Sequence, residues 1–471
     1  MNEPITIGVI VSTRGFFPAW LAEQGRTQIL DRLRSLGIEA VILPDDATAH
    51  GAVETLDDAR KCAALFRKRA DDIRGILVVL PNFGDELGVV EAIDRAALNV
   101  PVMVLACDDA LDKLDLRHRR DAFCGKLSVC CNLHQRGLPN TLTTLHTCEI
   151  DGDAAAQDIL FFRDVCRVVA GLRGARLGAI GQRPNPFNTV RFSEKLLQAS
   201  GISVQVVDLS EILAAATALG DAPEVTERVQ AIREYGRVAE SADEQKLRKA
   251  ACLALAMERW TEENQVVATA VQCWSSVQQN YGTAACLAMS MMGESGRPSA
   301  CETDVMGALS MYALQLASGE PSGYLDWNNN LGNDRERCIC LHCSNFPRGF
   351  LGQEPEIGTL DILGASLGED LCFGAVKGRV QPGPMTFAKI STDDLRGRVR
   401  AYVGEGEFTD DVVKTPGGVA TCQVPGLQDL LRHLCREGFE HHVAMSRSHC
   451  ADVLAEAFGN YLGWDCHRHE A

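Results

Sequence analysis

Short apolar runs rich in β-branched residues alternate with longer segments of helical periodicity in the first part of this chain. Residues 5–11, 75–80 and 100–106 are such runs, while residues 20–36 and 59–69 carry apolar side chains at helical spacing. Uninterrupted apolar strands separated by amphipathic helices are typical of a parallel sheet that helices cover on both faces. Because functional loops follow the carboxyl ends of such strands, we expect ligand contacts after these three runs.

A second strand–helix series begins near Arg176, and the pattern changes again near residue 350. Residues 176–180 and 203–207 are predicted as strands, and helical periodicity extends over 224–263. From 359 to 424, short strand-like runs are separated by frequent Gly, which favours an antiparallel sheet or a small barrel. The expected fold class is α/β, with two Rossmann-like, doubly wound parallel-sheet domains followed by a mostly antiparallel β domain.

The length of 471 residues exceeds what one ordinary core accommodates. We therefore divide the chain into three predicted domains. Residues 1–170 form an N-terminal α/β domain, residues 171–355 a second α/β domain, and residues 356–471 a β-rich C-terminal domain.

Charge and cysteine content limit the classes of function. The chain has 63 acidic and 46 basic residues, a net charge of -17 that would repel a phosphate backbone, so nucleic-acid binding is not expected. No apolar run approaches the length of a spanning helix, and the N-terminus does not read as a signal peptide, so no membrane partner is expected. Nineteen cysteines, an odd number, indicate reduced thiols and a cytoplasmic location.

No nucleotide cofactor is expected either. The chain contains no Walker-type phosphate loop and no dinucleotide fingerprint that leads from a strand into a helix. We place Gly404-Glu405-Gly406 in a turn between strands, where it would not hold a pyrophosphate.

Two acidic residues between positions 299 and 345 are candidates for chemistry. Glu302 lies between small and apolar residues at a loop-to-helix junction, and the alternative is a capping role, with Thr303 or Asp304 as the N-cap. Asp326 ends a short apolar segment and precedes Trp and three Asn, which predicts an irregular polar loop. The alternative for Asp326 is a turn-forming residue.

A histidine pair near the C-terminus could complete a metal site. His441 and His442 would point to opposite sides if this piece is extended, so at most one would face a given site. A structural role is the alternative for either residue. One Glu, one Asp and one His suit a hard cation, because carboxylates favour Mn²⁺ or Mg²⁺ and one imidazole shifts the choice toward Mn²⁺ or Co²⁺.

These segments together resemble the L-fucose isomerase and L-arabinose isomerase superfamily, and especially its fucose-isomerase-like branch. Residues 176–184 and 207–212 are similar to the start of the family's second domain. Residues 301–305 and 325–329 resemble the two metal–carboxylate segments, with Glu302 and Asp326 24 residues apart, and 441–443 resemble the C-terminal histidine pair. The resemblance is good from about 170 to 471 and rests on fold pattern before that.

The resemblance implies an isomerase that interconverts an aldose and a ketose through an enediol. It implies Glu302, Asp326 and His442 as metal ligands, and Glu302 and Asp326 as the base and the acid in unassigned order. Such chemistry requires a proton to leave C2 and return to C1, and a divalent cation can stabilise the charge of the enediolate. We expect Mn²⁺, with Co²⁺ or Mg²⁺ as alternatives.

The resemblance also implies a homo-oligomer, a hexamer or a trimer, in which the N-terminal domain contributes substrate contacts. Arg14, His134 and Gln135 are candidates there, with a surface cation as the alternative for Arg14. Trp327 could stack on a sugar. His342 shares one face of a predicted strand with Cys338 and Cys340, and it could line the site, accompany structural thiols or belong to a zinc site.

The predicted function is thus metal-dependent aldose–ketose isomerisation of a sugar of the L-fucose, D-arabinose or L-arabinose type, or of a modified hexose. A cationic pocket from Arg14, Lys126 or Arg183 would favour a sulfonated or phosphorylated sugar. The alternative is a non-catalytic sugar-binding or sensing protein made of two α/β lobes, although a binding protein has no need for two acids on one metal.

Overall fold

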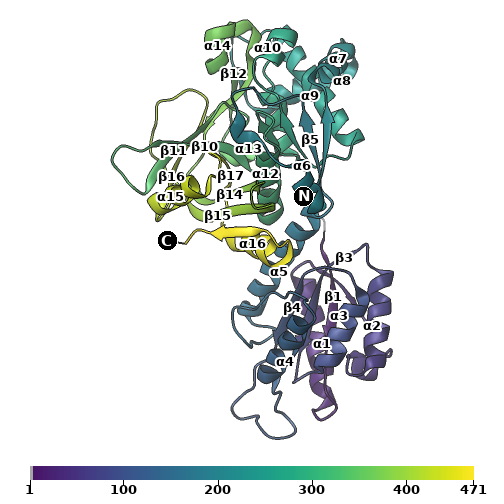
Figure 1. The fold of residues 1–471 in the computed structure, drawn as a ribbon. Helices are drawn as coiled ribbons and strands as arrows, with labels where there is room; N and C mark the ends of the chain where they lie inside the picture. The colour runs from purple at the N-terminus through teal and green to yellow at the C-terminus, as the bar shows by residue number, and fades with distance from the viewer. Residues whose placement is uncertain (1–3, 471) are drawn as a thin grey trace. The chain divides into compact units, whose positions relative to one another are not determined.

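The chain folds as two compact units in the computed structural model, which describes residues 4–470 (Figure 1). The N-terminal unit runs to Ala170 and includes the returning segment Glu456–Gly463; the C-terminal unit contains Gly171–Ala455 and the residues from Trp464 onward. Within the described residues, no helix is both long enough and apolar enough to cross a membrane. The three-domain boundaries stay a prediction.

The N-terminal unit is a doubly wound sheet of four parallel strands in the order β2-β1-β3-β4. Alternate side chains of the buried strands feed two separate cores, one on each face. Helices α1 and α5 cover one face, and α2, α3 and α4 cover the other. The strands are β1 (Thr6–Val11), β2 (Glu39–Ile42), β3 (Ile73–Leu80) and β4 (Val102–Ala106), and the helices are α1 (Ala19–Ser35), α2 (Leu56–Lys68), α3 (Glu86–Ala96), α4 (Ala122–Gln135) and α5 (Asp153–Leu172).

The C-terminal unit begins with a second parallel sheet, in the order β6-β5-β8-β9. The segment predicted as helical over 224–263 divides into two helices, because Gly236 ends the first and Asp243 caps the second. The strands are β5 (Arg176–Ile180), β6 (Ser203–Val207), β8 (Ala268–Val271) and β9 (Ser299–Cys301), and the helices are α6 (Glu194–Ala199), α7 (Leu209–Leu219), α8 (Pro223–Tyr235), α9 (Glu244–Glu263), α10 (Ser276–Tyr281), α11 (Cys286–Glu294) and α12 (Val305–Ser318).

Six antiparallel strands of the C-terminal unit close into a barrel. Their order is β15-β14-β17-β10-β11-β16, and β16 pairs back onto β15. These strands are β10 (Gly323–Asn330), β11 (Arg337–His342), β14 (Gly383–Asp393), β15 (Arg398–Phe408), β16 (Gly418–Gln423) and β17 (His442–Ser446). The strands β7 (Arg237–Val238), β12 (Glu356–Thr359), β13 (Phe373–Arg379) and β18 (Asp465–Arg468) extend the sheet, and the remaining helices are α13 (Arg348–Leu351), α14 (Asp361–Leu367), α15 (Leu427–Glu437) and α16 (Ala451–Ala455).

The predicted fold class is confirmed, but two local predictions are wrong. Asp326 does not lie in an irregular loop, because barrel pairing with β17 and β11 holds the chain extended to Asn330. The Gly404–Gly406 segment is not a turn but part of β15. A Cβ at Gly406 would lie 2.4 Å from the carbonyl oxygen of Gln423, so glycine is needed for the close approach of β16.

Replacing Gly406 should therefore loosen the barrel where it closes. We expect Gly406→Ala to lower the free energy of unfolding by about 1–3 kcal/mol, because the new methyl group meets backbone rather than a side chain that can move away. Urea unfolding monitored by circular dichroism measures the change. Gly358→Ala is the matched control, since its Cβ would meet Ala239 Cβ at an ordinary 3.6 Å. Equal stability of the two variants would contradict the prediction.

Candidate functional site

The candidate site lies where the second parallel sheet meets the barrel. Glu302 directly follows β9, Asp326 lies in β10, His342 ends β11 and His442 begins β17. The register of the barrel places Asp326 beside His442 on one neighbouring strand and beside Leu341 on the other. Strand pairing therefore brings together residues that lie more than a hundred positions apart in the chain.

The turn that carries Glu302 has an unusual backbone. Glu302 and Thr303 both adopt positive φ angles, 61° and 57°, which non-glycine residues rarely adopt and which cost free energy. Asp304 then begins α12: its Oδ1 accepts a hydrogen bond of 2.8 Å from the amide of Gly307. The capping role considered for Asp304 is confirmed, and the turn leaves the Glu302 carboxylate facing the site while the helix starts behind it.

Two carboxylate oxygens converge on one imidazole nitrogen. Glu302 Oε2 lies 3.2 Å from His442 Nε2, and Asp326 Oδ1 lies 3.5 Å from the same nitrogen. Both oxygens are buried, and neither receives a hydrogen bond from any residue that the structure describes. Buried polar atoms normally have partners, so this arrangement fits a cation held by two carboxylates and one imidazole.

A buried hydrogen-bond network fixes the other nitrogen of the His442 ring. His442 Nδ1 lies 3.1 Å from Asp304 Oδ2, which also accepts hydrogen bonds of 2.6 Å from the Tyr324 hydroxyl and from Lys389 Nζ. Nδ1 also lies 2.5 Å from the Tyr324 hydroxyl. Because this hydroxyl donates its own proton to Asp304, the Nδ1 proton is directed to these two oxygens and the lone pair of Nε2 faces Glu302 and Asp326. Metal-binding histidines are commonly oriented by such a carboxylate.

The charges of this network shift two pKa values. Burial works against the Asp304 carboxylate, but the Lys389 ammonium and His442 outweigh it, so the pKa of Asp304 lies below its usual range. Burial likewise lowers the pKa of His442, and the neighbouring carboxylates of Asp304 and Glu302 more than offset that effect, so the net shift is upward. The network therefore holds Asp304 as an anion at neutral pH.

A cavity of about 530 Å³ opens beside these groups. Its volume lies within the range of about 300–1,000 Å³ that is common for small-molecule sites. Polar groups and a few aromatic rings line it, while no lysine or arginine is found among its lining residues in the described chain. The lining includes Glu302, Asp326, Asn328, His342, His441, His442, Asp361, Phe187 and Trp274. Such a wall can hold a hydroxylated ligand beside the carboxylates.

The structure brings together four of the residues predicted for the site, namely Glu302, Asp326, His342 and His442. Trp327 does not line the cavity: its Nε1 donates a hydrogen bond of 3.0 Å to the Tyr402 hydroxyl, and its ring packs against Phe387. Its predicted sugar contact is therefore not seen in this cavity.

The remaining three predicted residues belong to the N-terminal unit. Arg14 follows β1, pairs with Glu86 and lies 4.3 Å above the Phe83 ring. His134 and Gln135 end α4 and are exposed. Their substrate contacts stay a prediction.

Sequence reasoning missed Tyr324 and Lys389 and gave Asp304 only a capping role. Tyr324 stands two positions before Asp326, so strand alternation could have placed both side chains on one face. Lys389 stands between the apolar residues Ala388 and Ile390 of a strand, which is a signal for a buried charge with a partner. The partner itself, 85 positions away, could not be read from the sequence.

The ion pair of Asp304 with Lys389 should dominate local stability. We expect Asp304→Asn to cost about 3–5 kcal/mol, because it leaves a buried ammonium without its counter-charge. Lys389→Met should also lower the free energy of unfolding on its own. The double variant should lose clearly less free energy than the sum of the losses of the two single variants. Urea unfolding of the three variants measures the coupling.

The stabilisation that the ion pair of Asp304 with Lys389 gives to the folded state should also depend on pH. Because the pKa of Asp304 is lower in the folded than in the unfolded state, its contribution is complete well above about pH 3.9 and is lost as the pH falls below it. If the free-energy costs of Asp304→Asn and Lys389→Met at pH 7 simply add up in the double variant, the coupling between the two residues is contradicted.

Comparison with known families gives two matches along the chain. Residues 8–173 match the model of the fucose/sulfoquinovose isomerase N-terminal domain. Residues 340–469 match the model of the L-fucose isomerase C-terminal domain. The second match includes His342 and His442. The two matched regions follow one another along the chain, the N-terminal domain before the C-terminal domain.

Several curated proteins are similar to the chain. A sulfoquinovose isomerase of Alkalicoccus urumqiensis is 27% identical over 318 residues, which cover 64% of this chain and 67% of that protein. A sulfoquinovose isomerase of Priestia aryabhattai is 23% identical over 313 residues, 65% of this chain and 67% of the relative. One from Clostridium sp. (strain MSTE9) is 25% identical over 175 residues, 37% of this chain and 39% of that protein. With both domain models and these relatives in agreement, the chain belongs to the fucose-isomerase-like family of sugar isomerases.

Proposed function

We propose that the chain is a divalent-metal-dependent aldose–ketose isomerase in which Glu302, Asp326 and His442 hold the cation. The observation that carries this proposal is the pair of buried carboxylate oxygens that face the Nε2 lone pair of His442 and receive no hydrogen bond from residues 4–470. His342 is a further candidate ligand, since one of its ring nitrogens lies within 4.8 Å of ligand atoms of Glu302 and His442. Mn²⁺ suits this donor set best, with Co²⁺ or Mg²⁺ as alternatives.

The bound cation would supply one function, stabilisation of the negative charge that develops on the two neighbouring sugar oxygens. Glu302 and Asp326 would move the proton from C2 to C1, one as base and the other as acid. Asp304 would keep the His442 ring in place throughout. The cavity wall, with Phe187 and Trp274 on it, would limit the access of water to the reacting carbons.

A sulfonated hexose is the first substrate to test, because the similar curated proteins are sulfoquinovose isomerases. The three cations considered for an anionic sugar do not line the cavity. Arg183 donates to the carbonyls of Pro184 and Asn185, and the Lys126 ammonium is buried against Thr143 and the carbonyl of His146. A sulfonate would thus need a cation from outside this lining, which agrees with the predicted homo-oligomer, a hexamer or a trimer.

Removing the metal should abolish proton exchange. We expect protein treated with a chelator to catalyse no exchange of the C2 proton of the sugar in D₂O, and Mn²⁺ to restore it, because the charge on the reacting oxygens would otherwise be unstabilised. Proton magnetic resonance of sulfoquinovose, L-fucose and D-arabinose measures the exchange. A non-catalytic sugar-binding protein would instead bind one of these sugars after chelation and show no exchange in either condition.

Neutralising either acid should remove turnover while the fold persists. We expect Glu302→Gln and Asp326→Asn each to lower kcat by about 10²–10⁴-fold, the range for loss of a general acid or base. Glu356→Gln is the matched control: it makes the same chemical change at a carboxylate that pairs with Arg237 on the surface of β12. Unchanged turnover of Glu302→Gln on a confirmed substrate would refute the assignment of Glu302.

A further inference from the structure

Four cysteines converge next to the candidate site. Cys273 follows β8, Cys286 is the first residue of α11, Cys301 ends β9 and Cys343 follows β11. The Cys343 thiol interacts electrostatically with the other three, and Cys273 interacts in the same way with Cys301. Because the carboxyl ends of β8 and β9 meet at one edge of the parallel sheet, thiols that follow these strands gather at a single place.

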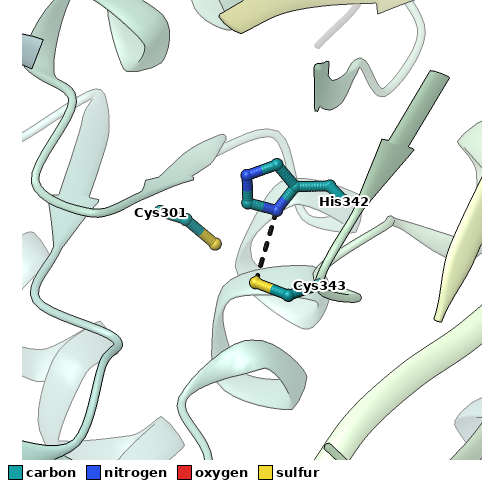
Figure 2. A group of neighbouring side chains, drawn as sticks. All are labelled: Cys301, His342 and Cys343. Carbon is teal, nitrogen blue, oxygen red and sulfur yellow. Dashed lines mark hydrogen bonds between the residues drawn. The ribbon is translucent and has the colours of Figure 1, made fainter. Parts of the chain in front are cut away.

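His342 adds a nitrogen donor to two of these sulfurs. Its Nδ1 lies 3.5 Å from Cys343 Sγ, and Figure 2 shows the Cys301 sulfur facing the same space between the ring and Cys343. Ligand atoms of Cys301, His342 and Cys343 all lie within 4.8 Å of one another. Tetrahedral zinc has bonds of about 2.3 Å to sulfur and 2.0–2.1 Å to nitrogen, so its ligand atoms stand roughly 3.3–3.8 Å apart, and small side-chain rotations would close this set around an ion.

A second group of cysteines provides an internal comparison. Cys338, Cys340 and Cys422 also lie within 4.8 Å of one another, but they offer no nitrogen ligand. His342 and Cys343 both line the cavity of about 530 Å³, so an ion could reach the first group from that cavity.

We propose that Cys301, His342 and Cys343 bind a soft divalent cation of the zinc class. This ligand set is distinct from Glu302, Asp326 and His442. The ion on Nδ1 would fix the ring of His342, which also faces Glu302 and His442. The thiolate site would thus act as a positioning element for the carboxylate centre.

Cobalt substitution tests the proposal on the full-length protein. The reduced, metal-free protein is titrated with Co²⁺, and the thiolate-to-cobalt charge-transfer band in the near ultraviolet is recorded. Oxygen and imidazole ligands give no such band, so the carboxylate centre cannot produce it. We expect the band in the wild-type protein, its loss on addition of Zn²⁺, and its loss in Cys343→Ser, with Zn²⁺ bound about tenfold or more weakly by that variant.

Two variants separate this site from the alternatives. Cys340→Ser alters a buried thiol of the second cysteine group and should keep the band, and Glu302→Gln should keep it as well. A wild-type protein without the band, a band unchanged in Cys343→Ser, or one lost in Cys340→Ser would overturn the proposal. An active isomerase without the band would refute the thiolate site alone, while a band without isomerase activity would refute only the proposed function.

Alkylation of the wild-type protein gives a second test that does not depend on folding of a variant. We expect Zn²⁺ to protect Cys343, which lines the cavity, from iodoacetamide, as measured by mass spectrometry of its peptide. Cys435 is exposed and should react equally with and without Zn²⁺. Equal alkylation of Cys343 in both conditions would overturn the proposal.

Discussion

The carboxylate of Asp304 connects the fold of the C-terminal unit to its chemistry. One oxygen caps α12, and the other accepts hydrogen bonds from Lys389 on β14 and Tyr324 on β10 and lies next to His442 on β17. All four side chains are almost completely buried. A buried ion pair of this kind is costly to form without good partners, and here every partner also belongs to an element that shapes the site. The contact that joins the helix to the barrel therefore also orients the imidazole that would bind metal.

The turn before Asp304 shows the same dependence in its backbone. Glu302 and Thr303 hold positive φ angles between a strand of the parallel sheet and the capped end of α12. Such conformations persist only where the surroundings determine them, and here the amides of Thr303 and Asp304 bond to Val271 and Cys301. The result is a carboxylate that points away from its own helix, toward a histidine supplied by the barrel. The site is thus specified by long-range pairing more than by local preference.

This origin explains which parts the sequence could predict. The bounds of the strands at 176–180 and 203–207 agree with the prediction, because short runs that contain Leu, Ile or Val and lie close to Gly are a local signal in the sequence. The polar residues after Asp326 have low strand propensity and therefore predict a loop, but pairing within the barrel overrides this local preference.

The predicted ligand positions came from family resemblance and not from spacing or composition. Lys389 and Tyr324 were missed because their roles depend on Asp304, 85 and 20 positions away, through contacts that no local pattern encodes. The split of the fold into a parallel sheet and a barrel was visible in the change of periodicity, while the closure of β16 onto β15 was not. Closure depends on the close approach of the β16 backbone to Gly406, and nothing in the sequence distinguishes this glycine from the others in the chain.

The two proposed centres divide by the hardness of their ligands. Glu302 and Asp326 offer oxygen, Cys301 and Cys343 offer sulfur, and His342 stands in both groups. At an oxygen and nitrogen site, zinc binds more tightly than manganese, so such a site discriminates poorly by affinity alone. A neighbouring thiolate site removes part of this problem, because it binds zinc more strongly than the carboxylates do and leaves them to the harder cation. Because His342 belongs to both groups of ligands, it couples the two centres. A soft ion bound at Nδ1 would hold the His342 ring in a fixed orientation, and the carboxylate centre would then find this ring already positioned.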